Sequence, residues 1–191
     1  MGGKGDYEHK RDLLYGLSEP QHGYFTTQQA GAIGITTPYL HHYLRAGHII
    51  RVARGVYRLS RFPPGDQEDL ICIWLTTGRE GVFSHETALA LHQLSDILPA
   101  RLHVNLPPAW RRRKLPTTLE RHYTELAPSE VWWVGAVPVT SPRRTLEDCA
   151  AAHVSPEHLQ QALHQARTRG LIRETDATAY LPEPRRLQDR S

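Results

Sequence analysis

Long apolar runs are missing from this 191-residue sequence, and so are the cysteine pairs that most metal and redox sites use. No run approaches the length of a membrane span, and the N-terminus, MGGKGDYEHKRD, has no apolar core of a secretory signal. We therefore expect a cytoplasmic protein without membrane contact. The two cysteines, Cys72 and Cys149, lack the CxxC spacing of a metal site and are expected to be reduced, unpaired thiols.

Acidic residues are also missing between Gln21 and Gly65, a stretch that holds five arginines and four histidines. Residues 65–191, by contrast, carry fifteen basic and sixteen acidic side chains. The formal net charge of +3 is too small to indicate a partner, but the segregation of charge is informative. A local excess of positive charge is typical of a surface that faces nucleic acid.

The sequence has few of the elements that catalysis on nucleic acid needs. It contains three lysines, no Glu-x-Lys element behind an aspartate, and no phosphate-binding P-loop. The acidic pair Glu147 and Asp148 is expected to face solvent or to pair with Arg143 and Arg144, one turn earlier on a helix. We therefore predict that the protein is not an enzyme.

Metal-binding motifs are absent as well. The pair His85-Glu86 resembles the start of a zinc-protease HExxH motif, but the second histidine position is Leu89. Ser84 is expected to cap a helix, with His85 and Glu86 solvated rather than in a catalytic triad. Apart from the adjacent His41 and His42, none of the twelve histidines has close partners in the sequence. We assign no metal and no cofactor.

The most patterned part of the chain, residues 25–59, predicts two short helices and a β-hairpin. Thr26 is a good N-cap for a helix that Gly34 ends, and Pro38 suits the first turn of a second helix that ends at Gly47. A leading helix over residues 6–18 would complete the core. The buried face of the second helix is expected to hold Leu40, Tyr43 and Leu44.

After Gly47 the residues become β-branched and aromatic, which predicts a hairpin with arms at 49–52 and 56–59. Its arginines are expected on or near the tip, where they would contact the phosphate backbone. The helix pair with this hairpin predicts a winged helix-turn-helix, with the hairpin as the wing. The candidate DNA contacts are Thr26, Thr27, Gln28, Thr36, Thr37, Tyr39, His41, His42, Arg45, Arg51, Arg54 and Arg58.

Two prolines and a glycine at 63–65 interrupt all periodicity, so we place a domain boundary near Pro64. The predicted fold is α+β: a winged helix-turn-helix over residues 1–64, then a mixed α/β domain with a small sheet over residues 65–191. The second domain is expected to have helices near 66–77, 85–94, 142–152 and 156–170, and strands at 102–106, 121–123, 131–134 and 137–139. The final stretch, residues 181–191, has two prolines and is expected to be mobile.

A basic run in the second domain is the remaining charged signal. Residues 111–114 form this run and are expected on an exposed loop. They are either a solvated cluster or auxiliary contacts to flanking phosphates or to an acidic partner. Trp110 precedes the run, and one of the strand residues Trp132 and Trp133 is expected to point inward. The run consists of Arg111, Arg112, Arg113 and Lys114.

Several segments resemble the antitoxin and transcriptional-regulator component, AbiEi, of type IV toxin-antitoxin systems. The N-terminal match is GYFTTQQAGAIGI followed by PYLHHYLRAGHIIRVARGVYRL, and the C-terminal match is FSHETALALHQLSDILPARLHVNLP followed by VPVTSPRRTLEDCA. The resemblance covers about residues 20–155. The Arg-Gly-Val-Tyr-Arg hairpin and the Thr-Ser-Pro-x-Arg-Thr-Leu-x-Asp segment carry it most specifically.

This resemblance implies two roles: repression through binding of double-stranded DNA at inverted repeats in the protein's own promoter, and antagonism of a nucleotidyltransferase-type toxin through the C-terminal domain. The repressor role follows from the motif, whereas the toxin-facing surface cannot be assigned by residue. The alternative is a winged-helix module that contacts protein or RNA. That alternative predicts salt-sensitive DNA binding without sequence preference.

Overall fold

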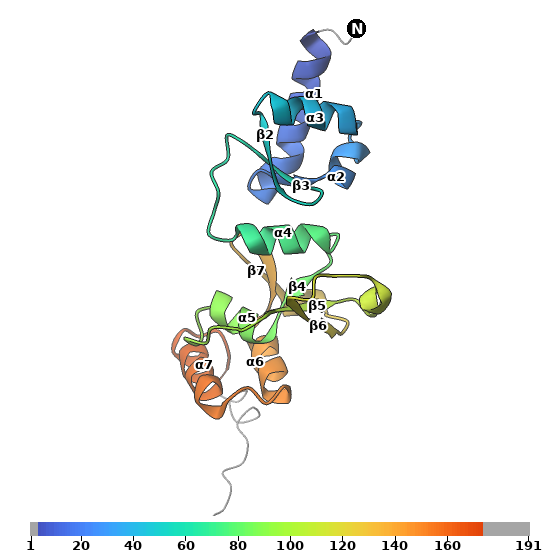
Figure 1. Cartoon of the computed structure of the whole chain (residues 1–191). Coiled ribbons are helices and arrows are strands. Elements are labelled where there is room, and N and C mark those ends of the chain that lie inside the picture. The colour runs from blue at the N-terminus through green and yellow to red at the C-terminus, as the bar shows by residue number, and fades with distance from the viewer. Residues whose placement is uncertain (1–3, 174–191) are drawn as a thin grey trace, which may run out of the picture. The chain divides into compact units, whose positions relative to one another are not determined.

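The computed structural model describes residues 4–173 and divides the chain into two compact units (Figure 1). The first unit runs to Gly81 and includes the short segment Gly135–Val137; the second holds Val82–Val134 and the chain from Pro138 onward. The C-terminal stretch predicted to be mobile, residues 181–191, lies outside the described residues. Within the described part, no helix combines the length and the apolar character needed to cross a membrane.

The first unit consists of helices around a three-stranded antiparallel sheet in the order β1-β3-β2. The predicted helices and hairpin are present, but β1 was not predicted, because three residues are too few to show an alternating pattern. The elements are α1 (Lys4–Ser18), η1 (Glu19–Gln21), β1 (Tyr24–Thr26), α2 (Thr27–Ala32), α3 (Thr37–Arg45), β2 (Ile49–Ala53), β3 (Val56–Leu59) and α4 (Glu68–Thr76).

Local sequence signals explain where these helices begin and end. The Thr26 side chain accepts a hydrogen bond from the Gln29 amide at 3.1 Å, and the Gln29 side chain accepts one from the Thr26 amide at 2.9 Å. This capping box satisfies two donors at the start of α2. Gly34, with φ of 79°, follows α2, and Pro38 lies in the first turn of α3.

The core of the first unit lies between α1, α2, α3 and the sheet. Leu40 and Tyr43 are buried as predicted, whereas Leu44 is half-buried. From the leading helix, Leu14 is a fully buried apolar residue. The cluster consists of Leu14, Phe25, Ala30, Ile35, Leu40, Tyr43, Ile49 and Leu59.

Gly23 stands where the chain enters β1, with φ of 87°, and a Cβ atom added there would overlap the side chain of Phe62. We expect Gly23→Ala to lower the free energy of unfolding by about 2–4 kcal/mol, since both the left-handed backbone and the overlap oppose a side chain. Urea titration measures this difference. Gly31→Ala is the control, because Gly31 lies in α2 and a Cβ atom added there would have no neighbouring atom within 4 Å. This substitution should raise the free energy of unfolding by about 0.5–1 kcal/mol. Equal effects of the two substitutions would contradict the prediction.

The expected boundary near Pro64 lies inside the first unit, because α4 packs on β1 and β3. The Tyr24 hydroxyl donates a hydrogen bond to the Glu68 carboxylate. The Gln67 side-chain oxygen accepts a hydrogen bond from the Ala136 amide at 3.0 Å, which joins the Gly135–Val137 segment to this unit.

The second unit contains a five-stranded mixed sheet in the order β6-β5-β4-β8-β7, with α5, α6 and α7 packed on one another. The predicted small sheet is therefore present. Its elements are β4 (Val82–Phe83), α5 (His85–Leu91), β5 (Leu102–Leu106), η2 (Pro108–Arg112), β6 (Leu119–Tyr123), η3 (Pro128–Glu130), β7 (Val131–Val134), β8 (Val137–Thr140), α6 (Pro142–Ala151) and α7 (Pro156–Thr168).

The core of the second unit joins its three helices. Leu89 of α5, Leu146 and Cys149 of α6, and Leu163 of α7 are buried in one cluster. Cys149 and the half-buried Cys72 are free thiols. With helices and two sheets, the fold class is α+β, as predicted.

Candidate nucleic-acid interface

One face of α3 is open to solvent and polar. Thr37, His41 and Arg45 follow one another at intervals of four residues and are all exposed, so they form a continuous strip along the helix. Leu40 and Tyr43 point the opposite way, into the core. The structure therefore brings three of the predicted contacts onto one helical face.

Tyr39 and His42 lie on a different side of α3, against α1. The Lys10 ammonium is 3.8 Å from the centre of the Tyr39 ring, which is half-buried. The Tyr7 ring lies 5.4 Å from both the Tyr39 and the His42 rings. These two predicted contacts therefore also have a packing role between α1 and α3.

The predicted contacts at the start of α2 differ in what their side chains already bind. The Thr26 hydroxyl is occupied by the capping box. Thr27 is half-buried and donates from its amide to the Gly55 carbonyl at 2.9 Å, which fixes α2 to the hairpin turn. Gln28 is exposed, and so is Thr36, which lies at the start of α3 rather than of α2. Of the residues in the α2 capping region, Gln28 thus has the most accessible side chain.

The hairpin of β2 and β3 follows α3 directly. Arg51 pairs with Tyr57 across the strands, and a bulge between Arg51 and Ala53 precedes the turn at Arg54 and Gly55, where Gly55 has φ of 76°. Arg51 and Arg54 are both exposed. Two of the three predicted wing arginines are therefore available to a partner.

Arg58 does not fit the prediction of a wing contact, because it is only 7% exposed. Its guanidinium donates a hydrogen bond to the Phe62 carbonyl at 2.7 Å and lies 3.7 Å from the Glu68 carboxylate. It also lies 5.8 Å from the centre of the Tyr24 ring. Arg58 is thus a structural residue that joins β3 to the chain leading into α4.

The distribution of charge supports α3 and the hairpin as the surface that contacts nucleic acid. The exposed arginines at 45, 51, 54 and 61 lie in the stretch from Gln21 to Gly65, which has no acidic residue. No carboxylate from this stretch offsets them, so α3 and the hairpin contribute only positive side-chain charge to this surface.

The family comparison concerns this part of the chain. Residues 17–60 match the family model described as "Transcriptional regulator, AbiEi antitoxin", so the resemblance inferred from the sequence is confirmed there. The match spans α2, α3 and the hairpin. The resemblance inferred for the later segments lies outside it and stays a prediction.

Other comparisons add little. No curated protein matches the sequence. Among solved structures, the crystal structure of the RV2827C protein from Mycobacterium tuberculosis aligns with 92% of this chain and 80% of that chain, at 17% identity and a TM-score of 0.42. This similarity is too weak to carry a functional conclusion.

The basic run Arg111–Lys114 in the second unit is exposed, as predicted. Arg113 lies 4.0 Å from the Trp110 ring centre, and Arg111 lies 5.2 Å from that of Tyr123. Aromatic side chains thus hold two of the four cations in place. Whether the run contacts DNA or a partner stays a prediction.

The tryptophans of β7 differ from the expectation that one of them points inward. Trp132 is 42% exposed and Trp133 is 60% exposed, whereas Trp110 is buried. The two tryptophans lie on β7, which is an edge strand of the sheet. Two neighbouring exposed tryptophans are unusual on a protein surface and are enriched at interfaces.

The acidic pair on α6 forms the predicted ion pairs. Arg143 lies 3.0 Å from Glu147, and Arg144 lies 2.8 Å from Asp148. Arg144 also binds Glu130 at 2.9 Å. The hydrogen bond from the Ala127 amide, followed by this contact with Arg144, lowers the pKa of Glu130 below its ordinary value. These carboxylates therefore have a structural role.

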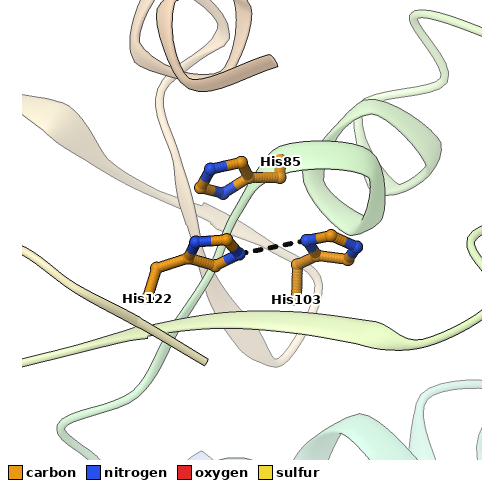
Figure 2. A group of neighbouring side chains, drawn as sticks. All are labelled: His85, His103 and His122. Atoms are coloured by element: carbon orange, nitrogen blue, oxygen red, sulfur yellow. Dashed lines mark hydrogen bonds between the residues drawn. The ribbon is translucent and has the colours of Figure 1, made fainter. Parts of the chain in front are cut away.

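Sequence reasoning missed a cluster of three histidines in the second unit, His85, His103 and His122 (Figure 2). These three histidines have no close partners in the sequence, so the expectation of no metal site was formed without this cluster. His85 is buried rather than solvated, Glu86 is half-buried, and Ser84 is buried as well. The Ser84 side chain makes no capping hydrogen bond to α5 and instead lies 3.0 Å from His85 Nδ1.

His92 gives a pH prediction for the second unit. Its Nε2–H donates a hydrogen bond to the Thr140 carbonyl at 2.7 Å, and burial lowers its pKa below the ordinary value of 6.5. Since the unfolded chain binds this proton more readily, stability is complete above pH 6.5 and falls as the pH drops, by up to about 1.4 kcal/mol per pH unit.

We expect His92→Asn to show a shallower loss of stability than the wild type between pH 6.5 and pH 5. Urea unfolding in EDTA at several pH values measures this slope. His164→Asn changes an exposed histidine of the same unit and should leave the slope unchanged. Three equal slopes would contradict the prediction.

Proposed function

We propose that the first unit is a winged helix-turn-helix that binds double-stranded DNA, and that the protein is a transcriptional repressor acting on its own promoter. The supporting observation is the exposed strip of α3, Thr37, His41 and Arg45, followed by the exposed Arg51 and Arg54 of the hairpin, in a stretch without acid. The family match over residues 17–60 supports the regulatory role.

The polar strip of α3 has the length and composition of a recognition surface. A helix fits the major groove, where threonine, histidine and arginine side chains can hydrogen-bond base edges. Arg51 and Arg54 lie beyond the helix on the wing, where contact to phosphates fixes the position without reading sequence. The proposed contacts with the most accessible side chains are therefore Thr37, His41, Arg45, Arg51 and Arg54.

Binding to the protein's own upstream DNA and to a scrambled duplex of the same composition tests this function. We expect a preference for the upstream DNA of about a hundredfold or more at physiological salt. Titration at several salt concentrations separates phosphate contacts from base contacts, because the former give the slope of affinity against salt. Equal affinity for both duplexes would overturn the repressor and favour the interaction or RNA-binding module.

We further propose that the second unit counters a nucleotidyltransferase-type toxin, as in type IV toxin-antitoxin systems. The observation in its favour is the exposed pair Trp132 and Trp133 on an edge strand, which suits a protein contact. Coexpression with a nucleotidyltransferase encoded beside the gene tests this role. Wild-type protein should restore growth and a Trp132→Ser/Trp133→Ser variant should not; restoration by neither protein would overturn the antitoxin role.

The protein has no assigned reaction in this proposal. The prediction that it is not an enzyme stays a prediction, as do its cytoplasmic location and its independence of a cofactor.

A further inference from the structure

Three histidines of the second unit come from separate elements and meet over one face of the sheet. His103 lies in β5 and His122 in the neighbouring parallel strand β6. His122 stands opposite Asn105, two residues beyond His103, so both imidazoles lie on the same face. His85 begins α5 directly after β4, and Figure 2 shows its ring beside the other two.

The distances within the cluster suit a single small ion. One ligand atom from each ring lies within 4.8 Å of the other two. His103 Nδ1 and His122 Nε2 are 3.1 Å apart and share a hydrogen bond, which a bound ion would replace (Figure 2). This separation is close to the ~3.3 Å between two nitrogens on one tetrahedral zinc ion. The His85 ring is stacked on His122 with centroids 3.5 Å apart, which places its ligand atom near those of the other two rings.

Two of the rings have a polar partner on one ring nitrogen. His103 Nε2 lies 3.8 Å from the Glu86 carboxylate, and His85 Nδ1 lies 3.0 Å from the Ser84 hydroxyl. Histidine ligands of metal ions commonly have such a partner on the second ring nitrogen, which fixes the tautomer and the ring orientation. The arrangement leaves His103 Nδ1 and His85 Nε2 as the ligand atoms.

The environment keeps the cluster in the form that binds metal. Burial lowers the pKa of His85 to about 3 and lowers those of His103 and His122 below the ordinary value. Burial thus disfavours the protonated form of each ring, and the neutral imidazole is the form that binds a metal ion. His103 and His122 are only half-buried, which leaves a path from solvent.

We propose that His85, His103 and His122 form a binding site for one divalent transition-metal ion of the zinc class. Three imidazoles without a thiolate or a set of carboxylates favour zinc, cobalt, nickel or copper over calcium and magnesium. Three protein ligands leave a fourth position for water. Because the ion would join α5 to β5 and β6, it would stabilise the second unit. This site is independent of the proposed DNA binding, and it departs from the expectation that the protein holds no metal.

Metal titration of tag-free, full-length protein after EDTA treatment and desalting tests the site. Calorimetry with Zn²⁺ should give one ion per chain with a dissociation constant below about 1 µM, and Zn²⁺ should raise the melting temperature. Co²⁺ should give the visible absorption of a four-coordinate ion with nitrogen ligands. No binding by the wild-type protein in either titration would overturn the proposal.

Variants identify the ligands. His103→Gln and His122→Gln change half-buried rings and should each weaken Zn²⁺ binding at least about a hundredfold and remove the Co²⁺ absorption. The matched control His153→Gln/His164→Gln removes two exposed histidines of the same unit and should bind like the wild type. Circular dichroism confirms that each variant is folded. Loss of binding in the control, or undiminished binding by folded His103→Gln and His122→Gln, would also overturn the proposal.

Discussion

The variant Arg51→Ala/Arg54→Ala is expected to bind the protein's own upstream DNA about 10- to 100-fold more weakly than the wild type. Both side chains are exposed on the hairpin next to α3, so their removal takes away phosphate contacts without disturbing the core. The slope of log affinity against log salt should fall by about 1.8, because two phosphate neutralisations are lost. Fluorescence anisotropy at four salt concentrations measures both quantities.

The matched control, Arg101→Ala/Arg121→Ala, removes the same charge from two exposed arginines of the second unit. It should retain near wild-type affinity, since the proposed contacts lie in the first unit. If both double variants weaken binding equally, net charge rather than the hairpin governs DNA binding. If neither does, the wing assignment is wrong.

Arg58→Ala is expected to destabilise the first unit by about 2–3 kcal/mol, although its neighbours in sequence are candidate DNA contacts. The substitution removes the hydrogen bond to the Phe62 carbonyl and the ion pair with Glu68, and it leaves a cavity under the Tyr24 ring. Glu68 is partly exposed, so water compensates part of its lost partner. Chemical denaturation of the full-length protein, followed by tyrosine and tryptophan fluorescence, measures the change.

Arg51→Ala is the control for stability, because an exposed strand arginine should change the free energy of unfolding by less than about 0.5 kcal/mol. The two arginines are seven residues apart and belong to the same hairpin. Wild-type stability of Arg58→Ala, together with weaker DNA binding, would restore Arg58 to the proposed interface and contradict its structural role.

Much of the local structure follows from sequence alone. Thr26, Gly34 and Pro38 determine the ends of α2 and α3 through capping, left-handed backbone and fixed φ, which depend on a few adjacent residues. The hairpin follows from β-branched arms around Arg54 and Gly55. The acid-free stretch is visible without any coordinates, and so is the resemblance confirmed over residues 17–60.

Tertiary structure alone decided which side chains are exposed or meet across elements. Arg58 looks like a wing residue in sequence, but β1 adds to the far side of β3 and makes it a central strand, covered by the chain before α4. Alternation along a strand predicts that one of Trp132 and Trp133 points inward, but both are exposed on β7.

The histidine cluster depends on long-range pairing in the same way. His85, His103 and His122 are 18 and 19 residues apart in sequence, and no short motif joins them. Only the parallel register of β5 with β6, and the position of α5, bring their rings together. Sequence thus determined the local elements and the charge pattern, because both depend on adjacent residues. Strand order and register decided which side chains are buried and where the histidines meet, because burial and clustering depend on residues that are distant in the chain.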